Sequence, residues 1–412
     1  MIDSKIRLYS QRPNIHNLLY GLLLIFYLPT FVTRIVDIPY WGIVCYATIL
    51  LCDIVFLARI GKLSRPILYT LVLFGYFLLI TVFERVEDTW ECLLRTFLAV
   101  SFSIYMEYIF KRFGGKRAVC ILMCAFEVFL YINLLFMLLY PNGMYQVITN
   151  GIYEEVVRVE FGAARTQRRV LWLLGHQTML IRFTLPAICI AILYSYYKKG
   201  KLKLDIRSMM LIFACVVETI IANSAANYLI LALFIGLFLF FHFKGRIRNG
   251  LVYFGIIVVY LFIILISDGF DIFSILSAGL GRNVSFSTRI PIWINTISAW
   301  LQKPIFGWGY IDETSDAIRQ ILSAGNPHSS YFWALFEGGI IGLILLIWYM
   351  QFYSRRIRGY WKKIPTEVVY AAFVCLLVCM VSDDHIFRSP FYLVIFSLAY
   401  HVPQLALTVQ EK

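Results

Sequence analysis

Arg289 and His328 stand out in the long polar stretch between residues 267 and 330. A guanidinium offers a rigid fork of hydrogen-bond donors that matches phosphate oxygens. An imidazole works near neutral pH as a base or an acid. Pro327 disfavours helix at the residue before it, so we expect a helix to begin just after His328. These residue types suit a site that binds an anion and moves a proton; the alternatives are an interfacial anchor for Arg289 and an inert loop imidazole for His328.

Ionisable residues also fall inside apolar runs of the chain. They are Arg95, Glu127, Arg182, Glu218 and Glu337. A charge within a bilayer is costly and normally faces a partner or a wet cavity. Most of these residues lie in the outer halves of their runs, so we expect them to line a cavity that opens outward. A structural pair between Glu127 and Arg182, which lie at similar depth, is the competing interpretation.

The composition defines the class of protein that positions these residues. Of the 412 residues, 60% are hydrophobic and 15% are charged, whereas soluble domains are about 45–50% apolar and about 25% charged. The chain is therefore expected to be an all-α polytopic membrane protein. Most of the nine cysteines lie in apolar runs without metal-binding spacing, so we interpret them as small core residues.

Apolar runs long enough to cross a bilayer divide the whole chain, since a spanning helix needs about 20 apolar residues. We predict about 12 transmembrane helices in a single transmembrane domain over residues 1–412. The first run follows a short basic N-terminus and is interpreted as a retained span, not as a cleaved signal peptide. The predicted spans are residues 15–33, 39–57, 66–83, 90–110, 118–140, 170–197, 206–222, 225–243, 250–266, 331–353, 366–382 and 388–403.

Lys and Arg orient these spans because they concentrate in cytoplasmic segments. The distribution places both termini in the cytoplasm and accounts for the net charge of +13 as a topological signal. Nucleic-acid binding would instead need a basic stripe on a soluble face. The long segments 141–169 and 267–330 are then external, the second between the ninth and tenth spans. It should contain short interfacial helices, one of them with Ile292, Trp293, Ile297 and Trp300 on the membrane surface.

Two further groups of residues are candidates on the external side. Arg165, Arg168 and Arg169 end the first external segment, shortly before His176. Arginines there run against the usual charge distribution, which a bound anion would explain, although solvent or lipid phosphates are alternative partners. Asp383-Asp384-His385 is a candidate metal site beside a phosphate, but three adjacent ligands rarely converge on one ion.

Several of these motifs, in their order along the chain, resemble the O-antigen polymerase and O-antigen ligase superfamily. Its members show an arginine, a Pro-containing G-x-G stretch, a histidine usually followed by Asn, and a G-I-I/L-G helix. Ser329 stands where Asn is usual. Arg168-Arg169 and Gly175-His176-Gln177 are similar to the superfamily's other arginine-bearing loop, with Arg169 as the matched arginine. The main resemblance rests on Thr288-Arg289, Trp293, Pro304-Ile305-Phe306-Gly307-Trp308-Gly309, Pro327-His328-Ser329-Ser330-Tyr331 and Glu337-Gly338-Gly339-Ile340-Ile341-Gly342.

The resemblance implies a metal-independent glycosyltransferase without a cofactor, at the outer face of the bacterial plasma membrane. Its donor would be an oligosaccharide on undecaprenyl pyrophosphate, embedded among membrane lipids, and a chain-length regulator protein is a candidate partner. Arg169 and Arg289 would hold the pyrophosphate, because fixed cations stabilise a leaving anion. His328 would act on the acceptor hydroxyl as a base or an orienting group. The residues assigned to substrate binding are Arg165, Arg168, Arg182, Glu337, Trp308 and His176.

Three functions follow as hypotheses. The first is a polysaccharide polymerase that joins repeat units for a capsule or an O-antigen. The second is the O-antigen ligase, which transfers the glycan to a lipid acceptor. The third, from another class, is a transporter or flippase with twelve spans; the long central cytoplasmic loop of the major facilitator fold is replaced here by the short segment Lys198–Asp205. A purely structural membrane partner would leave the Arg and His residues unexplained.

Overall fold

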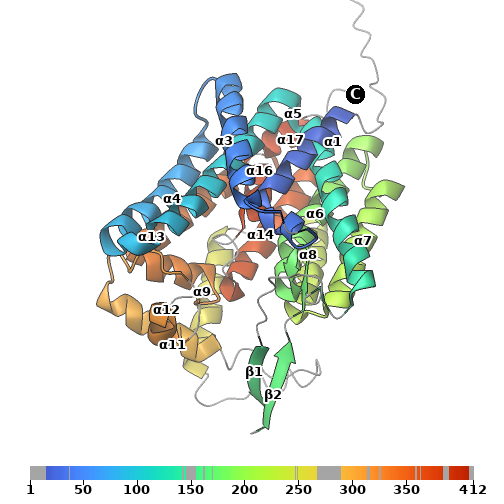
Figure 1. Ribbon diagram of the computed structural model, residues 1–412. Coiled ribbons are helices and arrows are strands. Elements are labelled where there is room, and N and C mark those ends of the chain that lie inside the picture. Colours follow the sequence, from blue (N-terminus) through green and yellow to red (C-terminus); the bar gives the residue numbers. More distant parts are fainter. Residues whose placement is uncertain are drawn as a thin grey trace, which may run out of the picture.

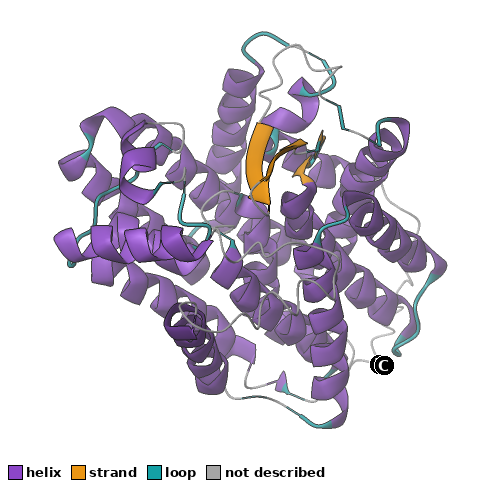
Figure 2. Ribbon diagram, turned by 90° about the horizontal axis from the view of Figure 1, so that it is seen from below, coloured by secondary structure: helices purple, strands orange, loops and turns teal. Residues whose placement is uncertain are grey.

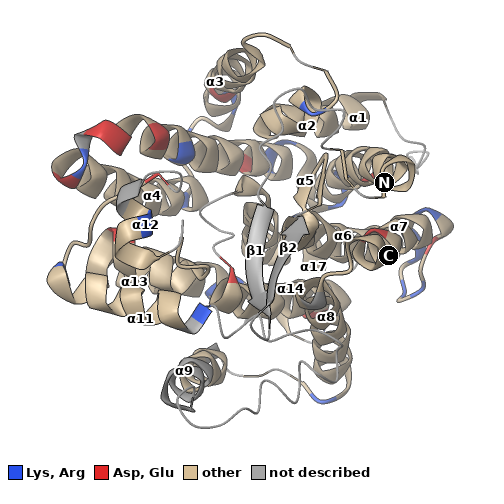
Figure 3. Cartoon of the chain, turned by 60° about the horizontal axis from the view of Figure 1, so that its bottom comes forward, with Lys and Arg blue, Asp and Glu red and all other residues tan. Residues whose placement is uncertain are grey.

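The computed structural model of this chain is a bundle of helices with two short β-hairpins (Figure 1). Charged residues are sparse along the helices (Figure 3). The structure describes residues 15–36, 38–141, 143–144, 155–160, 163–168, 170–245, 247, 249–266, 289–312, 316–323, 326–357, 360–361, 363–383 and 389–407.

Seven helices in the described part of the chain are long and apolar enough to cross a membrane. This confirms a multi-pass helical membrane protein, while the total of twelve spans and their orientation stay predictions. They are α3 (Trp41–Ile60), α4 (Arg65–Glu84), α5 (Thr89–Leu139), η3 with α6 (Gln177–Lys199), residues Ala226–Phe243 of α8 (Ala225–Phe243), α13 (Ser330–Ile357) and α14 (Ile364–Ser382).

The 51 residues of α5 contain two of the predicted spans. Gly114 separates them with φ of 74° and ψ of 167°, a conformation that glycine adopts without steric cost. The remaining described helices include α9, a strongly apolar helix of 18 residues, and a set of shorter helices. They are α1 (Ile15–Leu22), η1 (Leu23–Tyr27), α2 (Pro29–Thr33), η2 (Val86–Asp88), α7 (Ile206–Ala222), α9 (Asn249–Ile266), α11 (Arg289–Gln302), α12 (Asp316–Leu322), η5 (Pro390–Tyr392), α16 (Leu393–Tyr400) and α17 (Val402–Leu407).

Local sequence explains where several helices begin and end. Pro66 and Pro365 lie in the first turns of α4 and α14, where the missing N–H costs nothing. Gly61 and Gly200 follow α3 and α6 in the left-handed conformation that ends a helix.

Helices α6 and α14 form the centre of the bundle, and both are largely buried inside the protein. The long helix α5 packs against α1, α3, α4, α6 and α7, and α14 packs against α6, α8 and α16. By contrast, α3 and α8 expose most of their apolar surface, as expected of helices that face lipid.

Two antiparallel hairpins add to the helical architecture, and the sequence analysis did not predict them. β1 (Glu155–Glu160) pairs with β2 (Ala163–Arg168), and β3 (Leu171–Trp172) pairs with β4 (Gly175–His176). The signal was present in the valines of β1, because β-branched residues favour strands. Seen from below, the strands lie over the middle of the helix bundle (Figure 2).

The hairpin β1–β2, α11 and α12 lie at one end of the molecule, and α17 lies at the opposite end (Figure 1). The described parts of the predicted segments 141–169 and 267–330 that these elements represent therefore share one end, away from the last described helix.

Of the four α11 residues predicted on the membrane surface, Ile292, Trp293, Ile297 and Trp300, the prediction is wrong for Trp293. Trp293 is fully buried against Phe332 of α13, with the two ring centroids 5.5 Å apart, and Ile297 and Trp300 pack on the same cluster. The start of α13 gives this apolar face a protein partner, which the helical pattern alone does not reveal.

Candidate functional site: an arginine-lined cavity

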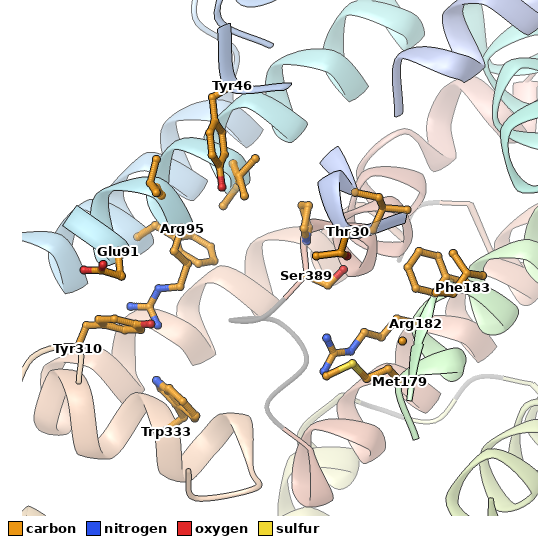
Figure 4. A pocket seen from close by; sticks show the side chains of 18 of the residues that line it. Thr30, Tyr46, Glu91, Arg95, Met179, Arg182, Phe183, Tyr310, Trp333 and Ser389 are labelled. Carbon is orange, nitrogen blue, oxygen red and sulfur yellow. The ribbon is translucent and has the colours of Figure 1, made fainter. Parts of the chain in front are cut away.

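A cavity of about 530 Å³ opens among α3, α5, α6, α13 and the segments near them. Its volume falls within the range of small-molecule sites, roughly 300–1,000 Å³. Figure 4 shows two ends: Arg182, Met179 and Ser389 at one, and Arg95, Glu91, Tyr310 and Trp333 at the other. The described lining includes three arginines, Arg34, Arg95 and Arg182.

Arg182 is the predicted site residue that lines this cavity. It lies in the first turn of α6, and its side chain is buried. A guanidinium nitrogen, Nη2, lies 3.8 Å from Oδ1 of Asp383, the residue that follows α14. At this distance the two side chains form an ion pair, and the atoms named lie too far apart for a hydrogen bond.

Arg289 begins α11 and reaches the same end of α14. Its Nη1 donates to the carbonyl oxygen of Ser382 at 2.7 Å. The last carbonyls of a helix carry partial negative charge, which favours a cation there. Since Ser382 precedes Asp383, the structure brings Arg289 and Arg182 to two neighbouring residues.

His328 stands beside this point in an uncommon backbone conformation. Its φ is 50°, a left-handed value that few non-glycine residues adopt, and its N–H donates to Oδ1 of Asn326 at 2.8 Å. Two residues later, the N–H and the hydroxyl of Ser330 both donate to the carbonyl oxygen of Asp383 at 2.9 Å. The end of α14 therefore joins the segments that carry Arg182, Arg289 and His328. Backbone strain of this kind clusters at functional sites.

Glu337 lies elsewhere than predicted, because its carboxylate is taken up by Arg95. The two form a bidentate pair, with Nη1–Oε1 at 3.0 Å and Nη2–Oε2 at 2.8 Å. Glu337 is fully buried, and Arg95 extends from it to the cavity wall, 4.6 Å from the centroid of the Tyr310 ring. Glu337 thus acts on the cavity through Arg95, which it neutralises.

The G-x-G turn, Gly307-Trp308-Gly309, is bound to α13 by backbone hydrogen bonds. This contact between the turn and α13 is called the lock below. Gly339 interrupts that helix with φ of 62° and ψ of −160°. The carbonyls of Phe336 and Glu337 accept hydrogen bonds from the N–H groups of Trp308 and Gly309, both at 2.9 Å. In return, Ile340 N–H donates to the carbonyl of Pro304 at 2.9 Å. The break in the helix therefore loses few backbone hydrogen bonds, because the turn supplies them.

Trp308 is part of this lock. Its Nε1 donates to the carbonyl of Ala299 in α11 at 2.8 Å, and the ammonium of Lys303 lies 4.6 Å from its ring centroid. Lys303 also pairs with Glu84 at the end of α4. These contacts hold the turn, and the substrate contact of Trp308 stays a prediction.

Replacing Glu337 by alanine should lower the free energy of unfolding by about 3–5 kcal/mol, because it leaves the buried charge of Arg95 without its partner. Thermal unfolding of the purified protein measures this loss. The double variant Arg95→Leu/Glu337→Leu should be less destabilised than Glu337→Ala. Glu87→Ala, which breaks an exposed pair with Arg85, serves as the control and should change little. A Glu337→Ala protein as stable as this control would contradict the assignment.

The other predicted residues are distributed as follows. His176 lies in β4 next to the cavity-lining Gly175, and its Nδ1 lies 2.9 Å from the hydroxyl of Thr178. Arg165 and Arg168 lie in β2, opposite Arg158 and Glu155 in the register. Arg169, Asp384 and His385 lie outside the described residues. The structure therefore tests neither the role predicted for Arg169 nor the candidate metal site at Asp383-Asp384-His385.

The predicted pair between Glu127 and Arg182 is not formed. Glu127 accepts two hydrogen bonds from Arg207 at the start of α7, and Arg182 contacts Asp383 instead. Equal depth along two apolar runs did not predict the ion pair correctly, because Arg207 of α7 lies closer to Glu127.

Sequence reasoning missed Arg34, Tyr310 and Trp333 as cavity residues. One signal was available for Arg34: it is a basic residue at the outer end of the first predicted span, where the charge distribution disfavours Lys and Arg. Nothing in the local sequence marks Tyr310 or Trp333, whose positions depend on the lock between the G-x-G turn and α13.

These features define a multi-pass helical membrane protein with a cation-lined cavity. Residues 208–347 match the family model described as O-antigen ligase, a segment that runs from α7 into α13 and contains Arg289, His328 and Glu337. The match confirms the resemblance to the O-antigen polymerase and ligase superfamily. It supports a membrane enzyme of glycosyl transfer, and it fits polymerases and ligases equally. No curated protein matches the chain.

Proposed function

We propose that this protein is a bacterial polysaccharide polymerase that joins oligosaccharide repeat units for a capsule or an O-antigen. Its donor is a repeat unit on undecaprenyl pyrophosphate, used at the outer face of the plasma membrane. One observation carries the proposal. A cavity lined by arginines lies beside the end of α14, where the segments of Arg182, Arg289 and His328 meet. The family match supports it independently.

The reaction breaks the bond between the sugar's anomeric carbon and the pyrophosphate oxygen, and it forms a bond from that carbon to an acceptor hydroxyl. Negative charge grows on the departing pyrophosphate, and Arg182 and Arg289 stabilise it as fixed cations. The acceptor hydroxyl loses its proton as it attacks, and the imidazole of His328 accepts or orients that proton. The products are the lengthened glycan and undecaprenyl pyrophosphate.

The opposite end of the cavity suits the glycan. Glu91 offers acceptors for sugar hydroxyls, and Tyr310 and Trp333 offer aromatic faces against which the C–H groups of a sugar ring pack. Arg95 contributes little free charge there, since Glu337 neutralises it.

The O-antigen ligase is the second candidate, because the matching family model is described by that activity and the match does not separate the two. The two activities share the donor and the leaving group and differ in the acceptor. A transporter predicts two six-helix halves related by a two-fold axis; no observation favours it.

Polymer length in cells tests the proposal. Cells carrying Arg289→Ala, Arg169→Ala or His328→Ala should lose long chains and keep one-repeat material, at normal membrane levels of each variant. His328→Asn is the matched control for the backbone, because Asn tolerates a left-handed φ yet lacks the imidazole; it should fail like His328→Ala. Lipid-bound polymer that is never attached would indicate the ligase. Unchanged polymer in all variants would refute the site.

A further inference from the structure

Arg34 is a cavity residue that neither the motifs nor the family match includes. It follows α2, lines the cavity, and is half-buried. Its Nη1 donates to the carbonyl oxygens of Trp172 at 2.9 Å and Leu173 at 2.7 Å, in the turn between β3 and β4. Both bonds come from the same nitrogen, so the N–H groups of Nη2 and Nε remain available to another acceptor.

The three arginines of the cavity differ in how their charge is compensated. Glu337 neutralises Arg95 through two hydrogen bonds, and Asp383 lies 3.8 Å from Arg182. Arg34 contacts only neutral carbonyls, and no carboxylate in the described part of the chain pairs with it. Burial lowers the pKa of Arg34 to about 10, which still leaves the guanidinium charged at neutral pH. Arg34 therefore places an uncompensated positive charge in the cavity wall.

The carbonyls that hold Arg34 are themselves fixed. Trp172 Nε1 donates to the carbonyl of Tyr140 at 3.0 Å, and the N–H of Leu174 donates to Oδ1 of Asn133 at 3.1 Å. Asn133 in turn donates to the buried carboxylate of Glu218 at 3.0 Å. The turn is thus tied to α5 and α7, so Arg34 is positioned before any ligand arrives and loses little freedom on binding.

Arg34 also lies at one identifiable end of the cavity. Its guanidinium binds the β3–β4 turn, which continues into the cavity-lining Leu174 and Gly175. Gly175 lies against Met179, and Figure 4 shows Met179 beside Arg182, away from Glu91 and Tyr310. Two cations thus share one end, and the carboxylate of Glu91 lies at the other.

We propose that Arg34 binds a phosphate of the donor's pyrophosphate beside Arg182 and thereby fixes the donor's direction, with the sugar extending toward Glu91 and Tyr310. This inference rests on the proposed function, because it assumes a pyrophosphate-linked donor. It concerns a residue far outside the matched segment 208–347.

Binding of inorganic pyrophosphate to the purified full-length protein tests the anion site directly, by calorimetry in metal-free buffer. Arg34→Gln should weaken binding roughly 10–100-fold, the loss expected when one charged hydrogen-bond donor is removed. Arg34→Lys should fall between Arg34→Gln and the wild type, because it keeps the charge but not the fork. Arg85→Gln removes an arginine that pairs with the exposed Glu87 and should bind like the wild type.

Unfolding temperatures of all variants are measured beside the binding. An Arg34→Gln protein that melts like the wild type and binds pyrophosphate equally well would overturn the inference, as would a wild type that does not bind pyrophosphate. Failure of the inference and failure of the proposed function remain distinguishable. Polymer made with an unchanged donor KM in Arg34→Gln refutes Arg34 alone, whereas pyrophosphate binding through Arg34 in a protein that makes no polymer refutes the polymerase alone.

Discussion

Replacement of Arg182 by glutamine is expected to lower the rate of glycan transfer by about 10²–10³, the usual cost of removing one fixed donor from a developing oxyanion. Arg182 is buried in the cavity wall, with the carboxylate of Asp383 3.8 Å from its guanidinium. Low polarity around a buried charge strengthens its interaction with the leaving pyrophosphate. Single-turnover assays with purified lipid-linked repeat units measure the effect, because they report the chemical step.

Two variants sharpen this test. Asp383→Asn removes the carboxylate beside Arg182 but keeps the backbone carbonyl that accepts from Ser330, so it should alter the rate much less than Arg182→Gln. Arg85→Gln should leave the rate unchanged. An Arg182→Gln enzyme that folds normally and reacts at the wild-type rate would remove Arg182 from the mechanism.

Replacement of Gly339 by alanine is expected to destabilise the protein by more than about 3 kcal/mol. The backbone there has φ of 62° and ψ of −160°, a combination that only glycine adopts readily. A Cβ atom would also lie 2.3 Å from the carbonyl oxygen of Ile305 and 2.7 Å from the nitrogen of Phe306. Both are backbone atoms of the turn that closes the break in α13, so neither can move without opening the lock.

Gly75→Ala is the matched control for this change. Gly75 lies inside the membrane helix α4, and an added Cβ would meet nothing within 4 Å, so alanine there should be neutral or slightly stabilising. Gly307→Ala should resemble Gly339→Ala, because its φ is 77° and its Cβ would lie 2.5 Å from the nitrogen of Gly339. Since both changes open one contact, the double variant should cost less than their sum. Thermal unfolding of the purified proteins gives these values; a Gly339→Ala protein as stable as Gly75→Ala would disprove the lock.

Much of the site was present in the sequence as separate pieces. Arg289, Arg182 and His328 were identified by their types and by their isolation in apolar or external segments. The structure adds that their segments meet at the end of α14. The G-x-G turn and the Glu337-Gly338-Gly339 segment were also visible as motifs, yet their mutual hydrogen bonds were not. The contacts by which Trp308 holds the turn and Glu337 neutralises Arg95 could therefore not be predicted.

By itself, the sequence determined that this protein crosses the membrane many times and resembles the polymerase and ligase superfamily. Hydrophobic length is a property of each segment alone, and the motifs lie close together along the chain. Only the tertiary structure decided which charges are neutralised and which share the cavity. Arg34 after α2, Arg95 on α5 and Arg182 on α6 line one cavity because distant elements pack together. The group that contacts each arginine comes from a distant part of the chain and is brought there by helix packing. These groups are two carbonyls for Arg34, Glu337 for Arg95 and Asp383 for Arg182.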